Sequence, residues 1–246
     1  MIKEKIIFIT GSSKGIGFGL AKHYFSKGYK VIINSNNLFN LKTASKKLDN
    51  CSYYKCNLTN EAKVKNLFLK LKKKYKKIDV LICNYGNSNF KNNDSDLKFA
   101  LENNFFTTFN TIKYALPLLK SKKSKIVCIS SICGVEDIDG APMGYSIAKS
   151  SLNTYVKLVS KKLAKKGIMI NNIAPGNIYF NGSTWEKKLK KNRNLIKNYI
   201  KTHVPVNSFG KINDITLMCD ALINSNNFFM TGQTFILDGG QTKGFF

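Results

Sequence analysis

Tyr145 and Lys149 lie four residues apart in a segment with helical character. Residues at this spacing share one face of a helix, so the ammonium group can lie near the phenol and favour its ionised form. A phenol with a lowered pKa can exchange a proton with a carbonyl or hydroxyl group near neutral pH. The serine pair Ser130 and Ser131 ends an apolar segment upstream, where a hydroxyl can hydrogen-bond a reacting oxygen. The pattern predicts proton transfer to a carbonyl or alcohol, and its alternative is a surface pair without a role.

A glycine-rich turn, with Gly11, Gly15 and Gly17, follows the first apolar segment and precedes a helix-like one. Such glycines allow a tight turn, close approach of the backbone to a diphosphate and close packing of helix on strand. The spacing G-x-x-x-G-x-G differs from the usual dinucleotide fingerprint G-x-G-x-x-G. Alone, the turn could also be an ordinary connection between a strand and a helix.

The elements that must position these residues alternate along the chain. Apolar β-branched segments predict strands at about 5–10, 30–34, 52–56, 79–83, 125–130, 168–174 and 234–237. Helical periodicity predicts helices at about 15–27, 38–48, 60–76, 96–118, 144–166 and 213–223. Gly28 has the position of a left-handed residue that ends the first helix. This alternation indicates repeated βαβ units around a parallel sheet.

Residues 178–205 interrupt the alternation, because connections between a strand and a helix are normally short. We call this segment the flap; it contains Trp185 and many basic residues. One interpretation is an amphipathic helix with Trp185, Leu189 and Ile196 packed inward. The other is a lid in which Lys187 and Lys188 hold an anionic substrate.

The chain of 246 residues carries a formal net charge of +26, from 40 Lys and Arg against 14 Asp and Glu. Such an excess first indicates nucleic-acid or membrane binding. Arg193 is the only arginine, whereas recognition of bases and phosphates relies on the planar arginine side chain. We therefore expect a solvated basic surface that arises from composition, no nucleic-acid or membrane partner, and at most an attraction for small anions.

The N-terminal segment, with four apolar residues at 6–9, is too short for a signal peptide, and no apolar run is long enough to span a membrane. Six cysteines without a C-x-x-C pair, and only two histidines, predict reduced thiols and no metal site. We expect a cytoplasmic protein with a single domain over residues 1–246.

Taken together, the motifs resemble those of the classical short-chain dehydrogenase/reductase family over the whole chain. The resemblance is carried by TGSSKGIG at 10–17, DVLICNYG at 79–86, the helix from Asn104 to Pro117, Ser131, the Tyr145/Lys149 pair, NIAPG at 172–176, and TGQ and DGG at 231–240. It implies an α/β fold: a single-domain Rossmann-type, doubly wound sheet of about seven parallel strands with helices on both faces.

The resemblance also implies roles for individual residues. Tyr145 is the general acid/base, Ser131 orients the substrate oxygen, Lys149 lowers the pKa of the phenol and holds the nicotinamide ribose, and Asn104 anchors a water molecule. The cofactor contacts that it implies are Gly11, Ser13, Lys14, Gly15, Ile16, Gly17, Ser35, Asn57, Leu58, Asn84, Gly86, Pro175, Gly176 and Ile178, together with Tyr145 and Lys149.

Several positions depart from the family pattern. The second strand ends without the carboxylate that NAD-preferring members carry, and Lys14 can meet a 2′-phosphate, so we expect NADP(H) in preference to NAD(H). Tyr85 replaces a small residue of the pocket wall. Phe180 replaces a threonine, which removes one expected hydrogen bond to the cofactor.

The substrate is open at this stage. A 3-oxoacyl thioester reductase is favoured, because the chain resembles 3-oxoacyl-carrier-protein reductases. One alternative is a dehydrogenase/reductase of surface-sugar, nonulosonate or nucleotide-sugar synthesis; another, of a different class, is a non-catalytic nucleotide-binding regulatory protein. The resemblance further implies a homotetramer or homodimer formed through the helices at 96–118 and 144–166 and the C-terminal strand.

Overall fold

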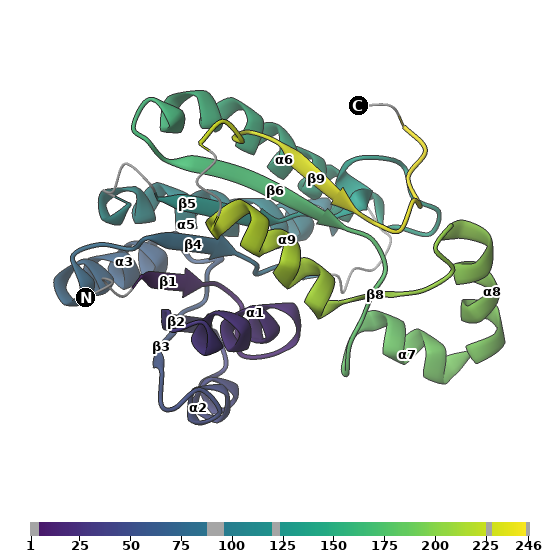
Figure 1. Cartoon of the computed structure of the whole chain (residues 1–246), viewed down its shortest axis with the longest axis horizontal. Coiled ribbons are helices and arrows are strands. Elements are labelled where there is room, and N and C mark those ends of the chain that lie inside the picture. The colour runs from purple at the N-terminus through teal and green to yellow at the C-terminus, as the bar shows by residue number, and fades with distance from the viewer. Residues whose placement is uncertain (1–4, 88–95, 120–123, 225–227, 245–246) are drawn as a thin grey trace.

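Seven parallel strands form the central sheet, in the order β3-β2-β1-β4-β5-β6-β9 (Figure 1). The computed structural model describes residues 5–87, 96–119, 124–224 and 228–244. The strands are β1 (Ile6–Ile9), β2 (Lys30–Ser35), β3 (Ser52–Lys55), β4 (Val80–Cys83), β5 (Lys125–Ile129), β6 (Met169–Pro175) and β9 (Thr234–Leu237). The strand order reverses between β1 and β4, where open α/β sheets bind ligands at the carboxyl ends of their strands.

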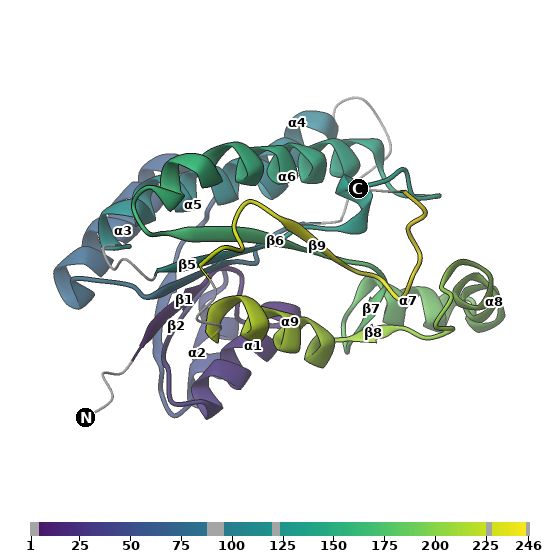
Figure 2. The same ribbon diagram turned by 45° about the horizontal axis from the view of Figure 1, so that its top comes forward.

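Helices cover both faces of the sheet (Figure 2). On one face lie α1 (Gly15–Ser26), α2 (Leu38–Lys46) and α9 (Ile212–Asn224); on the other lie α3 (Glu61–Tyr75), α4 (Asp96–Leu101), α5 (Thr107–Ala115) and α6 (Met143–Ala164). Phe8 belongs to the apolar cluster on the second face, whereas Ile7 and Ile9 belong to the cluster on the first. Successive strand residues point to opposite faces, and both faces are covered, which is why the strands are apolar throughout. The predicted fold class is confirmed.

The helix α3 shows how the lysine-rich sequence forms a surface helix. Its buried residues are Val64, Leu67, Phe68, Leu71 and Tyr75, while its lysines are exposed. The left-handed residue predicted at the end of the first helix is confirmed, because Gly28, which follows α1, has a φ of 76°.

The segment predicted as one helix at 96–118 contains a π-helical turn, Glu102–Phe106, between α4 and α5. The side chain of Asn104 lies at this turn, and its Nδ2 donates a hydrogen bond to the carbonyl oxygen of Ala100 at 3.2 Å. A side chain that takes a backbone acceptor competes with regular helical hydrogen bonding. Turns of this kind are frequent at functional sites.

The flap consists of β7 (Ile178–Tyr179), α7 (Thr184–Lys191) and α8 (Arg193–His203), and β7 pairs with β8 (Gly210–Lys211). In Figure 1 its two helices lie beyond the carboxyl end of β6. The expectation of one amphipathic helix was wrong, because Asn192 is extended and its Oδ1 accepts a hydrogen bond from the N–H of Leu195 at 3.0 Å, which starts a second helix. Ile196 is buried as expected, and Trp185 and Leu189 are half-buried.

Candidate active site

The residues singled out in the sequence gather at the carboxyl edge of the sheet. The glycine turn follows β1, Asn84 follows β4, Ser131 follows β5 by two residues, and Pro175 ends β6. Parallel strands place these four segments at one edge, and the flap lies at the same edge (Figure 1).

Ser131 and Tyr145 are brought together by a short turn that packs on α6. Ser131 precedes the 3-10 helix Ile132–Gly134, and its Oγ accepts a hydrogen bond from the N–H of Cys133 at 3.2 Å. A Cβ built on Gly134 would lie 2.5 Å from the carbonyl carbon of Lys149, so only glycine permits this packing. Ser131 also hydrogen-bonds the side chain of Tyr145. The sequence analysis did not identify Gly134, whose importance follows from the packing of the 3-10 turn on α6.

Ser130, the other serine of the pair, forms its hydrogen bond with Asn153 of α6. Its Oγ donates to Oδ1 of Asn153 on α6 at 2.6 Å, and Nδ2 of Asn153 donates to the carbonyl of Gly134 at 2.9 Å. These bonds hold the 3-10 turn on α6. Asn153 was not identified from the sequence, because no motif marks it.

Lys149 is buried behind Tyr145, with 3% of its surface exposed. Its Nζ donates a hydrogen bond to the carbonyl of Ile129 at 2.8 Å and lies 5.7 Å from the centroid of the Tyr145 ring. Burial disfavours the ammonium form and lowers the pKa of Lys149 to about 8.

The pKa of Tyr145 differs from the expectation. Desolvation raises the pKa of the phenol above its usual value, with a further increase from Cys133, while the hydrogen bond from Ser131 acts in the opposite direction. The lowering expected from Lys149 is therefore absent in this structure, since desolvation dominates. A phenol in this state is protonated at neutral pH and is poised to donate a proton.

Asn104 lies beside Lys149, but its side chain is fully engaged. Its Oδ1 accepts from the N–H of Asn87 at 3.0 Å, and its Nδ2 donates to the carbonyls of Asn87 and Ala100. A Cβ on Gly86 would lie 2.9 Å from Oδ1 of Asn104 and 3.6 Å from Nζ of Lys149. The missing side chain of Gly86 thus leaves room where the two catalytic candidates approach each other.

The glycine turn has the shape of an anion cradle. Gly11 and Gly15 have φ values of 60° and 59°, in the left-handed region, and a Cβ on Gly17 would lie 2.5 Å from the carbonyl oxygen of Gly11. No side chain caps the N-terminus of α1, so its first amides are available to a ligand. These residues fit a dinucleotide diphosphate. Ser13 and Ile16 are half-buried in this turn and Lys14 is exposed.

Asn84 holds the turn from the neighbouring strand. Its Nδ2 donates to the carbonyl oxygens of Thr10 and Gly11, both at 3.0 Å, and its N–H donates to Oγ1 of Thr10 at 2.9 Å. The side chain therefore orders the backbone on which the expected cofactor site is built.

The end of β2 forms the region where an adenosine ribose is expected. Ser35 is half-buried, and residues 34–37 contain no carboxylate. The Oδ1 of Asn57 accepts from both the N–H and the hydroxyl of Thr59, at 3.1 and 2.9 Å. The side chain of Leu58 is in the core, so only its backbone is left for a cofactor contact.

The end of β6 forms the opposite side of the site. Gly176 donates its N–H to the carbonyl of Leu237 at 3.0 Å, and a Cβ on it would lie 2.9 Å from Cβ of Asp238. Pro175 is the last residue of β6, while the side chain of Ile178 is buried and offers only its backbone.

Two departures from the family pattern have definite positions. Tyr85 packs against the core beneath α5, and its hydroxyl donates to Oδ1 of Asn103 at 3.0 Å. Its Cα and Cβ lie beside the glycine turn, at 2.9 and 3.1 Å from the position of a Cβ on Gly11, so its effect on the pocket wall stays a prediction. The ring of Phe180 lies against Gly15, with Cε2 2.9 Å from the position of a Cβ.

The flap presents an aromatic cluster with a cation on it. Trp185 stacks on Tyr199, with 5.4 Å between ring centroids, and Phe209 lies 5.5 Å away. The Nζ of Lys188 lies 4.6 Å from the centroid of the Trp185 ring. Burial raises the pKa of Cys133, while the hydrogen bond from Ser131 and the charges of Lys149 and Lys188 act in the opposite direction.

Comparison with known proteins identifies the family of the chain. The family model described as "Enoyl-(Acyl carrier protein) reductase" matches residues 11–242. The chain belongs to the short-chain dehydrogenase/reductase family and is an oxidoreductase of that family.

Relatives with assigned activities extend the comparison. The chain is 31% identical over 245 residues to 3-oxoacyl-[acyl-carrier-protein] reductase FabG of Rickettsia prowazekii (strain Madrid E), covering 96% of each chain. It is 26% identical to 3-oxoacyl-[acyl-carrier-protein] reductase of Bos taurus, covering 96% of this chain and 98% of the relative.

Solved structures share the fold. The structure "ElxO with NADP Bound" has a TM-score of 0.87 and 28% identity, with coverage of 97% of this chain and 98% of that one. L-sorbose reductase of Gluconobacter frateurii, complexed with NADPH and L-sorbose, has a TM-score of 0.89 at 20% identity, with coverage of 99% and 98%.

Within residues 5–87, 96–119, 124–224 and 228–244, no group of three or more His, Cys, Asp or Glu side chains is arranged to hold a metal ion. In the same part of the chain, no helix combines the length and hydropathy needed to cross a membrane.

Proposed function

We propose that the protein is an NADPH-dependent reductase of 3-oxoacyl thioesters. The observation that carries the proposal is the hydrogen bond between Ser131 and the protonated Tyr145, with Lys149 behind it and the glycine turn at the same sheet edge. The curated relatives in Rickettsia and cattle are reductases of this type, which supports the substrate class.

In this mechanism the bound nicotinamide supplies a hydride to the carbonyl carbon of the substrate. Ser131 donates a hydrogen bond that orients the carbonyl oxygen, and Tyr145 transfers its phenolic proton to that oxygen as charge develops. The ammonium of Lys149 stabilises the phenolate that remains. The side chain of Asn104 is engaged with Asn87 and Ala100, so its proposed contact with a water molecule is made by its backbone.

The preference for NADP(H) rests on charge. A carboxylate at the end of β2 would repel a 2′-phosphate, and residues 34–37 have none, while Lys14 is exposed next to the turn. The NADP-bound ElxO structure, with 28% identity, supports the same choice. We assign the expected cofactor contacts to the carboxyl edge of the sheet, with Leu58 and Ile178 acting through their backbone.

The test is NADPH oxidation by the purified protein with a 3-oxoacyl thioester. We expect turnover by the wild type and a loss of about a hundredfold or more in Tyr145→Phe. Tyr114→Phe is the matched control, because the hydroxyl of Tyr114 donates to Glu61 on the protein surface. Equal turnover of Tyr145→Phe and wild type would contradict the mechanism; turnover only with oxidised sugars or nucleotide sugars would replace the substrate class.

An anionic group on the substrate is a second element of the proposal. Within the part of the chain that the structure describes, Lys188 pairs with no acidic side chain, whereas Lys190 pairs with Glu186 at 3.0 Å. The ammonium of Lys188, held over the Trp185 ring of the flap, would meet a carboxylate or phosphate of the substrate.

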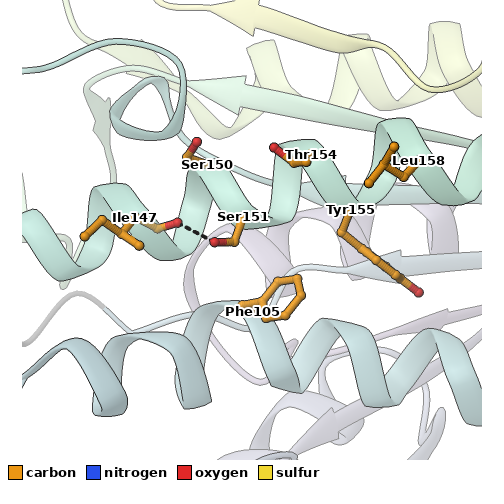
Figure 3. Close-up of a pocket in the computed structure, with 7 residues that line it drawn as sticks. All are labelled: Phe105, Ile147, Ser150, Ser151, Thr154, Tyr155 and Leu158. Carbon is orange, nitrogen blue, oxygen red and sulfur yellow. Dashed lines mark hydrogen bonds between the residues drawn. The ribbon is translucent and has the colours of Figure 1, made fainter.

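We further propose a homo-oligomer, a dimer or tetramer, formed through α6 and the neighbouring segment 96–118. A shallow groove of about 500 Å³ runs along α6 and is lined on its other side by Phe105 of the π turn. Figure 3 shows Ile147, Ser150, Thr154 and Leu158 along α6, with Phe105 facing them. Leu158 is 65% exposed, and small residues between apolar ones allow a second helix to approach closely.

Light scattering tests this interface. Leu158→Glu should dissociate the oligomer, whereas Leu69→Glu, at a leucine of α3 that is 50% exposed, should leave the mass unchanged. A monomeric wild type would contradict the proposal.

We also propose that the protein is located in the cytoplasm. All six cysteines are free thiols, and free thiols are typical of proteins in a reducing compartment.

A further inference from the structure

The side chain of Phe180 packs directly on the glycine turn. Its Cε2 and Cζ atoms lie 2.9 and 3.2 Å from the position of a Cβ on Gly15, so the ring fills the space that the glycine leaves. The ring also packs with Ile16 and Phe18 against the core on that face of the sheet. We propose that Phe180 is a positioning residue that couples occupancy of the dinucleotide site to the position of the flap. The inference rests on the proposed function in one respect, that the glycine turn binds NADP(H).

The ring of Phe180 and a bound diphosphate compete for the space next to Gly15. Gly15 is the first residue of α1, where the uncapped amides would bind the diphosphate. A charged diphosphate needs polar partners, and an apolar ring at van der Waals contact with Gly15 removes water from one side without offering a hydrogen bond. Binding therefore turns the ring away from the turn, and the protein loses the contact between Phe180 and Gly15.

A set of hydrogen bonds transmits this movement to α7. The N–H of Phe180 donates to Oγ of Ser183 at 3.3 Å, and the N–H of Ser183 donates to the carbonyl of Phe180 at 2.9 Å. The same Oγ caps α7 by accepting from the N–H of Glu186 at 3.0 Å, and Oε2 of Glu186 accepts from the N–H of Gly182 at 2.6 Å. Residues 180–186 thus form one connected unit, so that a displacement of Phe180 displaces the start of α7.

The helix α7 carries Trp185 and Lys188, and Lys188 is the flap residue that we propose to bind an anionic group of the substrate. Trp185 is the single tryptophan of the chain, and it is half-buried against Tyr199 and Phe209. A shift of α7 changes the stacking of this ring. The intrinsic fluorescence of the protein therefore reports the position of the flap.

The experiment titrates NADP⁺ into the full-length protein and follows calorimetry and tryptophan fluorescence together. The oxidised cofactor is used because, unlike NADPH, it does not absorb the emission of tryptophan. In the wild type we expect a saturable fluorescence change with the same midpoint as the calorimetric binding curve. In Phe180→Ala we expect NADP⁺ to bind about threefold to tenfold more tightly, because no ring has to be displaced, with most of the fluorescence change lost.

Two further variants complete the design. Phe180→Leu keeps an apolar side chain at the core and should show intermediate affinity and an intermediate fluorescence change, which covers the case in which the alanine variant does not fold. Leu195→Ala, at a leucine of α8 that is 63% exposed, should keep both the affinity and the fluorescence response of the wild type.

The outcomes separate this inference from the proposed function. Wild-type binding without a fluorescence change, or variants at position 180 with unchanged affinity and a full change, overturns the coupling and leaves the proposed function intact. A wild type that does not bind NADP⁺ by calorimetry contradicts the proposed cofactor and this inference with it.

Discussion

The ammonium group of Lys149 donates a hydrogen bond to the carbonyl oxygen of Ile129, the last residue of β5, at 2.8 Å. This bond fixes a buried cation between the sheet and Tyr145, with a pKa lowered to about 8. The proton on Lys149 is therefore lost at a pH well below that of an exposed lysine.

The pH dependence of reduction follows from this pKa. Below about 8 the ammonium is present and stabilises the phenolate formed when Tyr145 donates its proton; above it the charge disappears. We expect kcat for NADPH oxidation to fall as the pH rises through about 8. A rate that stays constant up to the pKa of an ordinary lysine would contradict this role.

The same burial predicts a cost in stability. Because the folded state disfavours the ammonium, the penalty is fully present below about pH 8 and is relieved as the pH rises toward the ordinary lysine pKa. At neutral pH, Lys149→Met removes this penalty but also removes the hydrogen bond to Ile129. As the net result, the free energy of unfolding should rise by roughly 1–2 kcal/mol, while turnover is abolished. Chemical denaturation measures this, with Lys161→Met at an exposed position of α6 as the control, for which no gain is expected.

The two adjacent serines should separate catalysis from stability. Ser131→Ala removes the hydroxyl that contacts Tyr145 and should lower kcat by about a hundredfold. Ser130→Ala leaves Oδ1 of Asn153 without its donor and should cost about 1–2 kcal/mol of stability with a smaller effect on kcat. Steady-state kinetics and thermal unfolding of both variants test this division of roles. A larger loss of kcat in Ser130→Ala than in Ser131→Ala would show that Ser130 is the catalytic serine.

The flap lysines form a matched pair. Lys188 and the neighbouring Lys187 are both exposed, and the Nζ of Lys188 lies 4.6 Å from the centroid of the Trp185 ring. Lys188→Glu should raise KM for a substrate with an anionic group by about tenfold, and Lys187→Glu should leave it close to the wild-type value. Equal KM values for the two variants would remove Lys188 from substrate binding.

The end of β2 sets the preference between cofactors. Ser35→Asp introduces a carboxylate where none exists in residues 34–37, so it should weaken NADP⁺ binding by about tenfold or more through repulsion of the 2′-phosphate. The same variant should bind NAD⁺ at least as well as the wild type. Calorimetry with both dinucleotides provides the internal control, and an unchanged ratio of the two affinities would place the ribose elsewhere.

Local patterns were sufficient for most of the fold. The apolar segments and helical periods placed the seven strands of the sheet and the helices α1, α2, α3, α6 and α9, because strands covered on both faces must be apolar throughout and α3 must bury Val64 and Leu71 on one side. The glycine turn was also predicted from local sequence, because Gly11 and Gly15 have left-handed φ values, which glycine adopts more readily than other residues.

The sequence by itself determined which residues were candidates for chemistry, whereas the tertiary structure decided what surrounds them. The packing of Gly134 on Lys149, the bond of Tyr85 to Asn103 and the contact of Phe180 with Gly15 each join two different elements of the fold. No local period encodes such approaches. The pKa values of Tyr145 and Lys149 depend on desolvation, a property of everything packed around a side chain, and therefore only the folded protein fixes them.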